Sequence, residues 1–323
     1  MLRTLLFSVF LVAACTAGSH SGPAQSETAE NPVYDAQHHQ ADRALATLRT
    51  LSSDRFAGRR TGTPGNARAI AWIEDRLTSM KVVPYGDNSY RHSFATHKFN
   101  APDETVKGTN LLAMIEGKGG ADSPLIVLSA HFDHLGKVNG DIYNGADDNA
   151  SGVAALLETI SWFQANPPDA TLIFAFFDAE ETGFGGSSHF VRTLSTTDRS
   201  RLAFNLNLDM VARADDGVLY AVGAYHNPRL VPLIDRTARS APITLKRGHD
   251  SPEWGDEDWS LMSDHAPFLR AGIPIIYLGV ENHADYHQPT DTFDRVDQAT
   301  FARSVDTVIL MAEAVDKWVA AKK

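Results

Sequence analysis

Several side chains that can bind metal ions or transfer protons follow short, continuous apolar runs of this sequence. They are His131 and Asp133 after 124–130 (PLIVLSA), Glu180 and Glu181 after 171–177 (TLIFAFF), Asp209 after 203–208 (AFNLNL), and His287 after 273–278 (IPIIYL). Such runs are typical of strands that are buried on both faces of a sheet. Because the carboxyl ends of parallel strands share one edge of the sheet, we expect these side chains to converge there.

Asp148 is expected to join this group from the start of a helix. Residues 151–163 (SGVAALLETISWF) carry apolar residues at helical spacing, and an Asp/Asn/Ser cap precedes them. Adjacent carboxylates such as Glu180 and Glu181 repel unless a cation or a proton separates them. Imidazole and carboxylate ligands without a thiol suit a catalytic zinc site, and two zinc ions would need a carboxylate between them.

The elements that must position these residues alternate between strand and helix. Helical spacing is found at 41–51, 65–80, 230–239 and 297–320, and further strands are expected at 90–99, 109–116, 218–222 and 243–245. This alternation predicts an α/β fold, in which one domain has a central, mostly parallel twisted sheet with helices on both faces. We assign residues 39–323 to this domain.

The N-terminal residues read as an export signal and a tether. Arg3, the apolar stretch 5–12 and the sequence VAAC ending at Cys15 resemble a bacterial lipoprotein signal, in which the cysteine is lipidated. Ordinary signal cleavage nearby, with Cys15 incidental, is the alternative. Residues 16–38 are small, polar and aperiodic, which predicts a flexible tether with His38 and His39 solvated. A periplasmic or cell-envelope location follows, and the membrane is reached only through the lipid.

Composition excludes one class of partner. The formal net charge is −11 and no basic block is present, whereas contact with nucleic-acid phosphates needs clustered Lys and Arg. We therefore expect no nucleic-acid partner. Cys15 is the only cysteine, so the folded domain has no thiol available for metal binding or a disulfide.

Five ordered motifs resemble those of the co-catalytic di-zinc aminopeptidases of the aminopeptidase S and aminopeptidase Y type. They are His-Phe-Asp at 131–133, Gly-Ala-Asp-Asp-Asn-Ala-Ser-Gly at 145–152, Asp-Ala-Glu-Glu-Thr-Gly at 178–183, Asn-Leu-Asp-Met at 207–210 and Tyr-His-Gln-Pro-Thr-Asp at 286–291. The resemblance covers roughly residue 41 to the C-terminus. It implies a zinc-exopeptidase fold, two zinc ions, and a monomeric enzyme that removes N-terminal residues from peptides with a free N-terminus.

The resemblance also implies roles for individual residues. One zinc ion would be held by His131 and Asp209, the other by Glu181 and His287, with Asp148 bridging both. Glu180 would be the general base for a metal-bridging water, Asp133 would orient the His131 ring, and Tyr286 would stabilise the oxyanion. Asn149 stands where relatives often have Asp, after a peptide bond that is cis in them.

Other functions and roles stay open. Glutaminyl cyclases of similar fold keep a single zinc ion, and a metal-free binding module could use the same fold. A carboxypeptidase would need an arginine for the substrate carboxylate, but Arg59 and Arg60 fit a solvated loop or a structural salt bridge better. His134, His265 and His283 are interpreted as structural or supporting residues, and Asp264 as the cap of a short helix.

Overall fold

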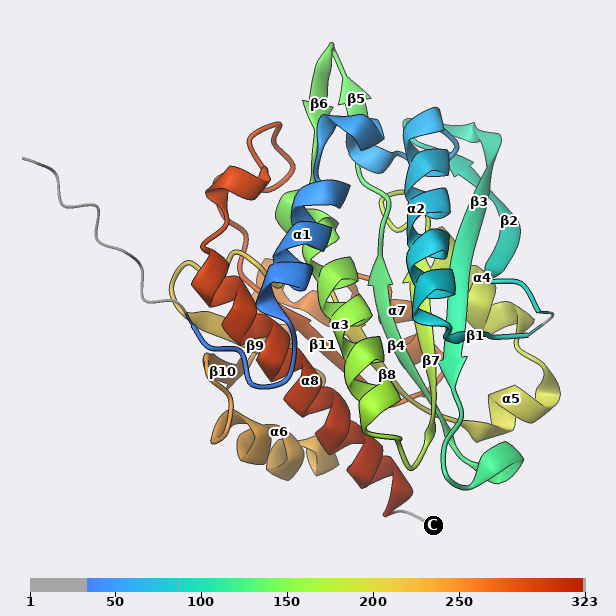
Figure 1. Cartoon of the computed structure of the whole chain (residues 1–323), viewed down its shortest axis with the longest axis vertical. Helices are drawn as coiled ribbons and strands as arrows, with labels where there is room; N and C mark the ends of the chain where they lie inside the picture. Colours follow the sequence, from blue (N-terminus) through green and yellow to red (C-terminus); the bar gives the residue numbers. More distant parts are fainter. Residues whose placement is uncertain (1–33, 87, 322–323) are drawn as a thin grey trace, which may run out of the picture. The chain divides into compact units, whose positions relative to one another are not determined.

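A nine-stranded mixed sheet forms the centre of the described part of this computed structural model, which covers residues 34–86 and 88–321 (Figure 1). The strand order is β1-β3-β7-β4-β8-β11-β9-β10, and β2 pairs with β3. The predicted signal segment with Cys15, and the tether as far as residue 33, lie outside the described residues. Among the residues described, no helix combines the length and the apolar character that crossing a bilayer requires.

The elements have the following bounds. The strands are β1 (Val83–Pro84), β2 (Arg91–Lys98), β3 (Ala101–Ile115), β4 (Leu125–His131), β5 (Gly136–Val138), β6 (Asp141–Tyr143), β7 (Thr171–Phe177), β8 (Leu202–Leu208), β9 (Val218–Val222), β10 (Thr244–Arg247) and β11 (Ile275–Gly279). The helices are α1 (Ala41–Leu51), α2 (Pro64–Met80), α3 (Gly152–Ala165), α4 (Gly185–Thr193), α5 (Thr196–Arg201), α6 (Val231–Ala238), α7 (Ala266–Arg270) and α8 (Gln298–Ala320).

The middle of the sheet is parallel and its flanks are mixed. Strands β7, β4, β8 and β11 run parallel to their neighbours in that order. Strand β3 is antiparallel to β1, β2 and β7, and β11 is antiparallel to β9. Only residues 99–100 separate β2 from β3, and a connection that short cannot make the crossover that parallel strands need. The predicted α/β fold class is confirmed, with its parallel part at the centre.

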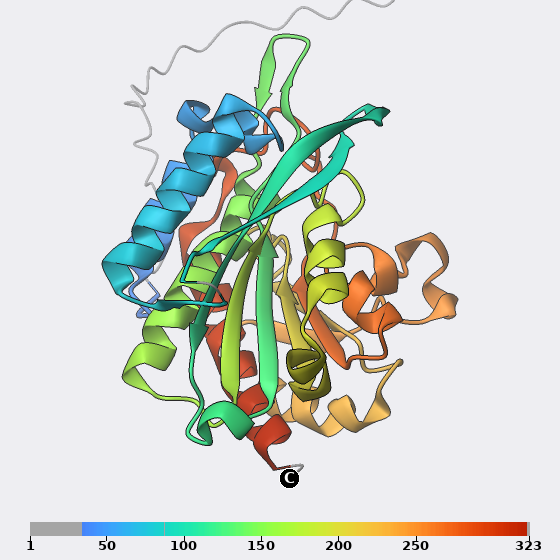
Figure 2. The ribbon, with the colours of Figure 1, turned by 90° about the vertical axis from the view of Figure 1, so that its right-hand side faces the viewer.

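Alternation along the central strands sends side chains to two helical layers. In β4, Ile126, Leu128 and Ala130 belong to the core shared with α1, α2, α3 and α8, whereas Leu125 and Val127 face the core shared with α4 and α7. Figure 2 shows the two layers on opposite sides of the sheet. All seven residues of β4 and of β7 are buried, as expected for strands covered on both faces.

Residues 34–39 are fixed to the long C-terminal helix. Asp306 of α8 accepts hydrogen bonds from Tyr34 Oη (2.6 Å), from the amides of Gln37 and His38, and from His39 Nδ1 (2.7 Å). The side chain of His39 is fully buried, and the His38 ring lies 5.0 Å from that of Trp162. The prediction that these two histidines are solvated is therefore wrong, because it ignored a buried carboxylate more than 260 residues away in sequence.

Candidate metal centre

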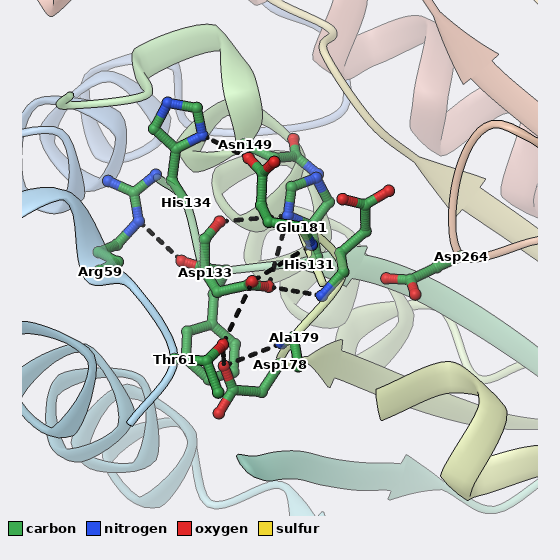
Figure 3. A network of polar contacts seen from close by, with 12 residues as sticks. Arg59, Thr61, His131, Asp133, His134, Asn149, Asp178, Ala179, Glu181 and Asp264 are labelled. Atoms are coloured by element: carbon green, nitrogen blue, oxygen red, sulfur yellow. Dashed lines mark hydrogen bonds and ion pairs between the residues drawn. The ribbon is translucent and has the colours of Figure 1, made fainter. Parts of the chain in front are cut away.

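Three neighbouring strands deliver the first part of the site. His131 is the last residue of β4, Glu180 and Glu181 follow β7, and Asp209 directly follows β8. Because β7, β4 and β8 are adjacent and parallel, these side chains meet at one edge of the sheet. Figure 3 shows His131 and Glu181 drawn together there. The convergence expected from the strand ends is found.

Asp148 lies at the centre of the cluster, and each of its two carboxylate oxygens faces a different histidine. Its Oδ1 lies 3.3 Å from Nε2 of His131, and its Oδ2 lies 3.1 Å from Nε2 of His287. The turn that carries it precedes α3, and Oδ1 of Asn149 accepts from the Gly152 amide (2.9 Å) at the start of that helix. The Asp148–Asn149 peptide bond is cis.

Each outer carboxylate directs one oxygen to a histidine and the other to a second donor. Oδ1 of Asp209 lies 3.1 Å from His131 Nε2, while its Oδ2 accepts from Ser263 Oγ (2.6 Å). Oε2 of Glu181 lies 3.5 Å from His287 Nε2, while its Oε1 lies 2.7 Å from His134 Nδ1. The cluster thus has two halves, which share Asp148.

This donor set fits zinc. Two ligands of a tetrahedral zinc ion with bonds of about 2.0–2.1 Å stand about 3.3 Å apart. The four separations between His131 or His287 and their carboxylates range from 3.1 to 3.5 Å. Two groups bring one donor atom per residue within 4.8 Å of one another: His131, Glu180 and Asp209, and His134, Asp148 and Glu181. Imidazole nitrogens and carboxylate oxygens are the ligands that a catalytic zinc ion uses.

Asp133 supports the turn that carries the two glutamates. Its Oδ1 accepts from the Glu180 amide (3.0 Å) and its Oδ2 from the Glu181 amide (3.4 Å). Nδ1 of His131 lies 3.2 Å from the backbone oxygen of Asp133 and 3.7 Å from its carboxylate. Thr61 Oγ1 donates to Asp178 Oδ1 (2.7 Å) and lies 3.3 Å from Asp133 Oδ2, which extends the network to the loop before α2 (Figure 3).

The crowding of acids alters their pKa values. Burial, with the charges of Asp209, Glu181 and Asp264, raises the pKa of Glu180 well above its usual range, although His131 opposes the shift. Burial and Asp148 likewise raise the pKa of Glu181. Burial lowers the pKa of His134 to about 4. Without a positive charge nearby, these buried carboxylates ionise with difficulty. A bound cation would stabilise their ionised form, so the cluster is suited to hold cations.

A cavity of about 300 Å³ opens onto the cluster. Asp148, Glu180, Glu181, Asp209 and His287 form its polar wall. The rest of its lining is mainly apolar and aromatic, with Phe184, Met210, Trp259, Met262, Tyr277, Val280 and Tyr286. The Tyr286 ring stacks on His287 at 3.9 Å between centroids. This volume is at the lower end of the range for small-ligand sites.

Arg59 and Asp264 depart from their predicted roles. Arg59 is fully buried and donates to the backbone oxygens of Leu51, Phe132, Asn144, Gly145 and Asp148, so it is neither solvated nor paired with a carboxylate. Asp264 does not cap α7, because its Oδ1 accepts from Ser187 Oγ of α4 (2.5 Å) instead. Short-range capping rules could not foresee a partner on another helix.

Sequence reasoning missed two residues that touch the candidate ligands. The sequence predicts only a structural or supporting role for His134, without an assigned partner, and for Ser263 only a place in the segment that caps a short helix. His134 follows His131 by three residues in the same polar turn, which is a signal that the sequence does carry. Ser263 lies 54 residues from Asp209, and no local pattern predicts that contact.

Comparisons with known proteins show that the chain is similar to one family of peptidases. The profile described as Peptidase family M28 matches residues 110–312. The chain is 29% identical over 238 residues to the probable lipoprotein aminopeptidase LpqL of Mycobacterium tuberculosis, covering 63% of this chain and 44% of LpqL. It spans about half the length of the curated relatives it matches.

Solved structures share the fold. BSAP, a zinc aminopeptidase from Bacillus subtilis, is 17% identical with a TM-score of 0.68, covering 86% of this chain and 95% of BSAP. A glutaminyl cyclase of an Acidobacteriales bacterium is 19% identical with a TM-score of 0.70, covering 91% of this chain and 100% of the cyclase. At these identities the likeness concerns the fold alone.

Proposed function

Because the chain belongs to peptidase family M28, we propose that it is an exported, zinc-dependent aminopeptidase that removes N-terminal residues from peptides. The observation that carries the proposal is that the two carboxylate oxygens of Asp148 face different histidines. Its Oδ1 lies 3.3 Å from Nε2 of His131, and its Oδ2 lies 3.1 Å from Nε2 of His287. A carboxylate placed in this way can bridge two cations. We propose that His131 and Asp209 hold one zinc ion and that Glu181 and His287 hold the other.

When bound, zinc would polarise the scissile carbonyl and lower the pKa of a water molecule to about 7. The catalytic roles that we propose for the protein belong to three residues. Glu180, at the cavity wall, takes a proton from the attacking water and passes it to the leaving amine. Burial and nearby carboxylates raise the pKa of Tyr286, so its phenol stays protonated and can donate to the developing oxyanion. Asp133 holds the turn of Glu180.

The substrates that we propose are peptides with a free N-terminus. The polar wall of the cavity is acidic, which favours a substrate ammonium group, and its apolar wall suits a side chain. We further propose that the protein is a monomer and that Cys15 anchors it to the cell envelope. The anchor is supported by the relative LpqL, which is named a probable lipoprotein aminopeptidase. Metabolic labelling with a fatty acid, compared with a Cys15→Ala variant, tests the anchor.

Glu180→Gln tests the mechanism. We expect turnover of aminoacyl chromogenic substrates to fall by about 10²–10⁴-fold, because the proton acceptor is lost. Elemental analysis should still find close to two zinc ions per chain, since the proposed ligands are intact. Glu253→Gln, at an exposed glutamate outside the cavity, is the control. Unchanged turnover in Glu180→Gln would remove this residue as the base.

Glutaminyl cyclisation is the second candidate, because cyclases share the fold. The presence of a histidine and a carboxylate on each side of Asp148 favours the peptidase with two zinc ions, and it also speaks against a metal-free binding module. A peptide beginning with glutamine separates the two enzymes. Release of a free amino acid supports the peptidase, whereas loss of ammonia from an intact chain supports the cyclase.

A further inference from the structure

His134 is the buried imidazole that contacts Glu181 from the side away from the cavity. Its Nδ1 lies 2.7 Å from Glu181 Oε1, while Glu181 Oε2 is directed to His287. His134 is not among the residues that line the cavity, and its side chain has no exposed surface. It therefore cannot contact a substrate bound there, and any effect it has on the reaction must pass through Glu181 or Asp148.

The ring of His134 is held in place. A Cβ at Gly145, whose φ is +54°, would lie 2.6 Å from Cδ2 of His134, so the backbone passes close to the ring and only glycine allows it. Its Nε2 is buried and has no hydrogen-bond partner among the described residues. The contact with Glu181 is thus the main polar interaction that this side chain makes, since Asp148 Oδ2 is farther away, at 3.6 Å.

The distance between its ring nitrogen and the nearest carboxylate oxygen distinguishes His134 from the candidate ligands. The pairs of His131 and His287 with carboxylates are 3.1–3.5 Å apart, the spacing of two ligands on one zinc ion. The 2.7 Å between His134 and Glu181 is that of a charge-assisted hydrogen bond, too short for two ligands of the same ion. Mutation of a residue that holds a ligand carboxylate in this way commonly weakens metal binding by about 10–100-fold.

We infer that His134 is a positioning residue, which donates a hydrogen bond from Nδ1 to Glu181 Oε1 and thereby turns Oε2 toward the metal ion shared with His287. The inference rests on the proposed function for the presence of that ion. It concerns the binding of one ion of the pair, because Asp209, in the other half, has Ser263 as its own second donor.

The experiment measures zinc affinity by chelator competition in three variants, with the visible spectrum of the cobalt-substituted protein as a second readout. His134→Ala removes the donor. His134→Asn replaces it, because the asparagine amide nitrogen occupies the position of Nδ1 relative to Cβ. His39→Ala is the matched control, since it removes a buried imidazole that also lies 2.7 Å from a carboxylate, that of Asp306, outside the metal centre.

We expect His134→Ala to bind one of the two zinc ions about 10–100-fold more weakly, and His134→Asn and His39→Ala to stay within about threefold of the wild type. The cobalt spectrum should change only in His134→Ala. Circular dichroism of each chelated variant checks folding. If His134→Ala does not fold, His134→Asn decides the test, because retained affinity supports the inference and lost affinity overturns it.

Two results overturn the inference alone. Unchanged affinity in His134→Ala would show that Glu181 needs no such donor. Equally weak binding in His134→Asn and His134→Ala would make His134 a ligand in its own right, since an amide cannot replace an imidazole on zinc. A wild-type protein that binds no zinc would instead overturn the proposed function, and the inference with it.

Discussion

At the residue scale, the chemistry of the site depends on how carboxylate oxygens are shared. Asp148 has one oxygen for each histidine, and Asp209 and Glu181 each have one oxygen for a histidine and one for a further donor. The half-exposed His287, with φ of +53°, closes the cluster from the solvent side.

Asp148→Ala should reduce zinc binding in both halves of the cluster. Among the described residues, Asp148 is the only one whose carboxylate forms an ion pair with both His131 and His287. We therefore expect zinc content to fall from near two ions per chain to well below one. Elemental analysis after gel filtration measures it. Asp169→Ala, at an exposed ion pair with Lys118, should leave the zinc content unchanged. Full occupancy in Asp148→Ala would discredit the bridge.

At the element scale, the strands and helices that build the site could largely be predicted from sequence. The apolar runs before His131, Asp178 and Asp209 form β4, β7 and β8 because strands covered on both faces need continuous hydrophobic sequence. The short hairpin of β5 and β6, between His134 and Asp148, was not predicted, because its strands have three residues each and carry no usable period.

The contacts between elements could not be predicted in the same way. Arg59 was placed in a solvated loop because its neighbours are turn residues, whereas its partners lie in the loops after β4 and before α3. Asp306 lies within the helical pattern 297–320, and nothing in that pattern indicates its partners in the segment 34–39. Both depend on segments brought together from far apart in the sequence, which a periodicity does not encode. Positions after strands predict His131, Glu181, Asp209 and His287 as ligands, and the start of a helix predicts Asp148. No such local position predicts the contact of Ser263 with Asp209.

Arg59→Met should destabilise the folded protein severely. The guanidinium supplies donors to five backbone carbonyls that tie α1 and the loops after β4 and before α3 together, and the variant leaves those buried oxygens unpaired. We expect the free energy of unfolding in urea to fall by more than about 3 kcal/mol.

Arg60→Met provides the comparison for Arg59. Arg60 is partly exposed and donates to a single carbonyl, that of Leu135. We expect a loss of about 1 kcal/mol for this variant. If Arg59→Met proves as stable as Arg60→Met, the carbonyl groups around Arg59 must find other hydrogen-bond donors. Arg59 would then not be needed to hold the loops together.

Asp306→Asn should loosen the segment 34–39 from α8. Although burial opposes it, hydrogen bonds from His39, Tyr34 and two backbone amides lower the pKa of Asp306 to about 2. Since the unfolded value is about 3.9, ionised Asp306 stabilises the fold above that pH, and this contribution is lost as pH falls toward 2. At pH 7 we expect a loss of about 1.5–3 kcal/mol in the free energy of unfolding.

Hydrogen exchange and acid titration check the role of Asp306. The amides of Gln37 and His38 should exchange faster in Asp306→Asn, and the difference in stability from the wild type should shrink between pH 4 and pH 2. Asp294→Asn, at an exposed aspartate, is the matched control. A stability difference that persists unchanged at pH 2 would mean that the charge of Asp306 is not what holds the segment.

At the scale of the whole molecule, the excess of acidic residues bears on the stability of the metal centre. The chain carries a formal net charge of −11, and Glu180, Glu181 and Asp209 meet at the edge of the sheet. Without metal ions, folding must bring those carboxylates together against their repulsion. Bound cations remove that cost, so metal binding and global stability should be linked.

Removal of zinc should therefore lower the thermal stability of the whole domain. An ion that binds only the folded protein, at a free concentration 100 times its dissociation constant, contributes about 2.7 kcal/mol. For a domain of about 285 residues, each ion then raises the unfolding temperature by about 4–5 °C. Calorimetry with and without a chelator, followed by return of zinc, measures the shift, and Asp148→Ala should show little of it. An unfolding temperature that is unchanged by chelation in the wild type would mean that the carboxylate cluster is stable without cations, and the linkage would be wrong.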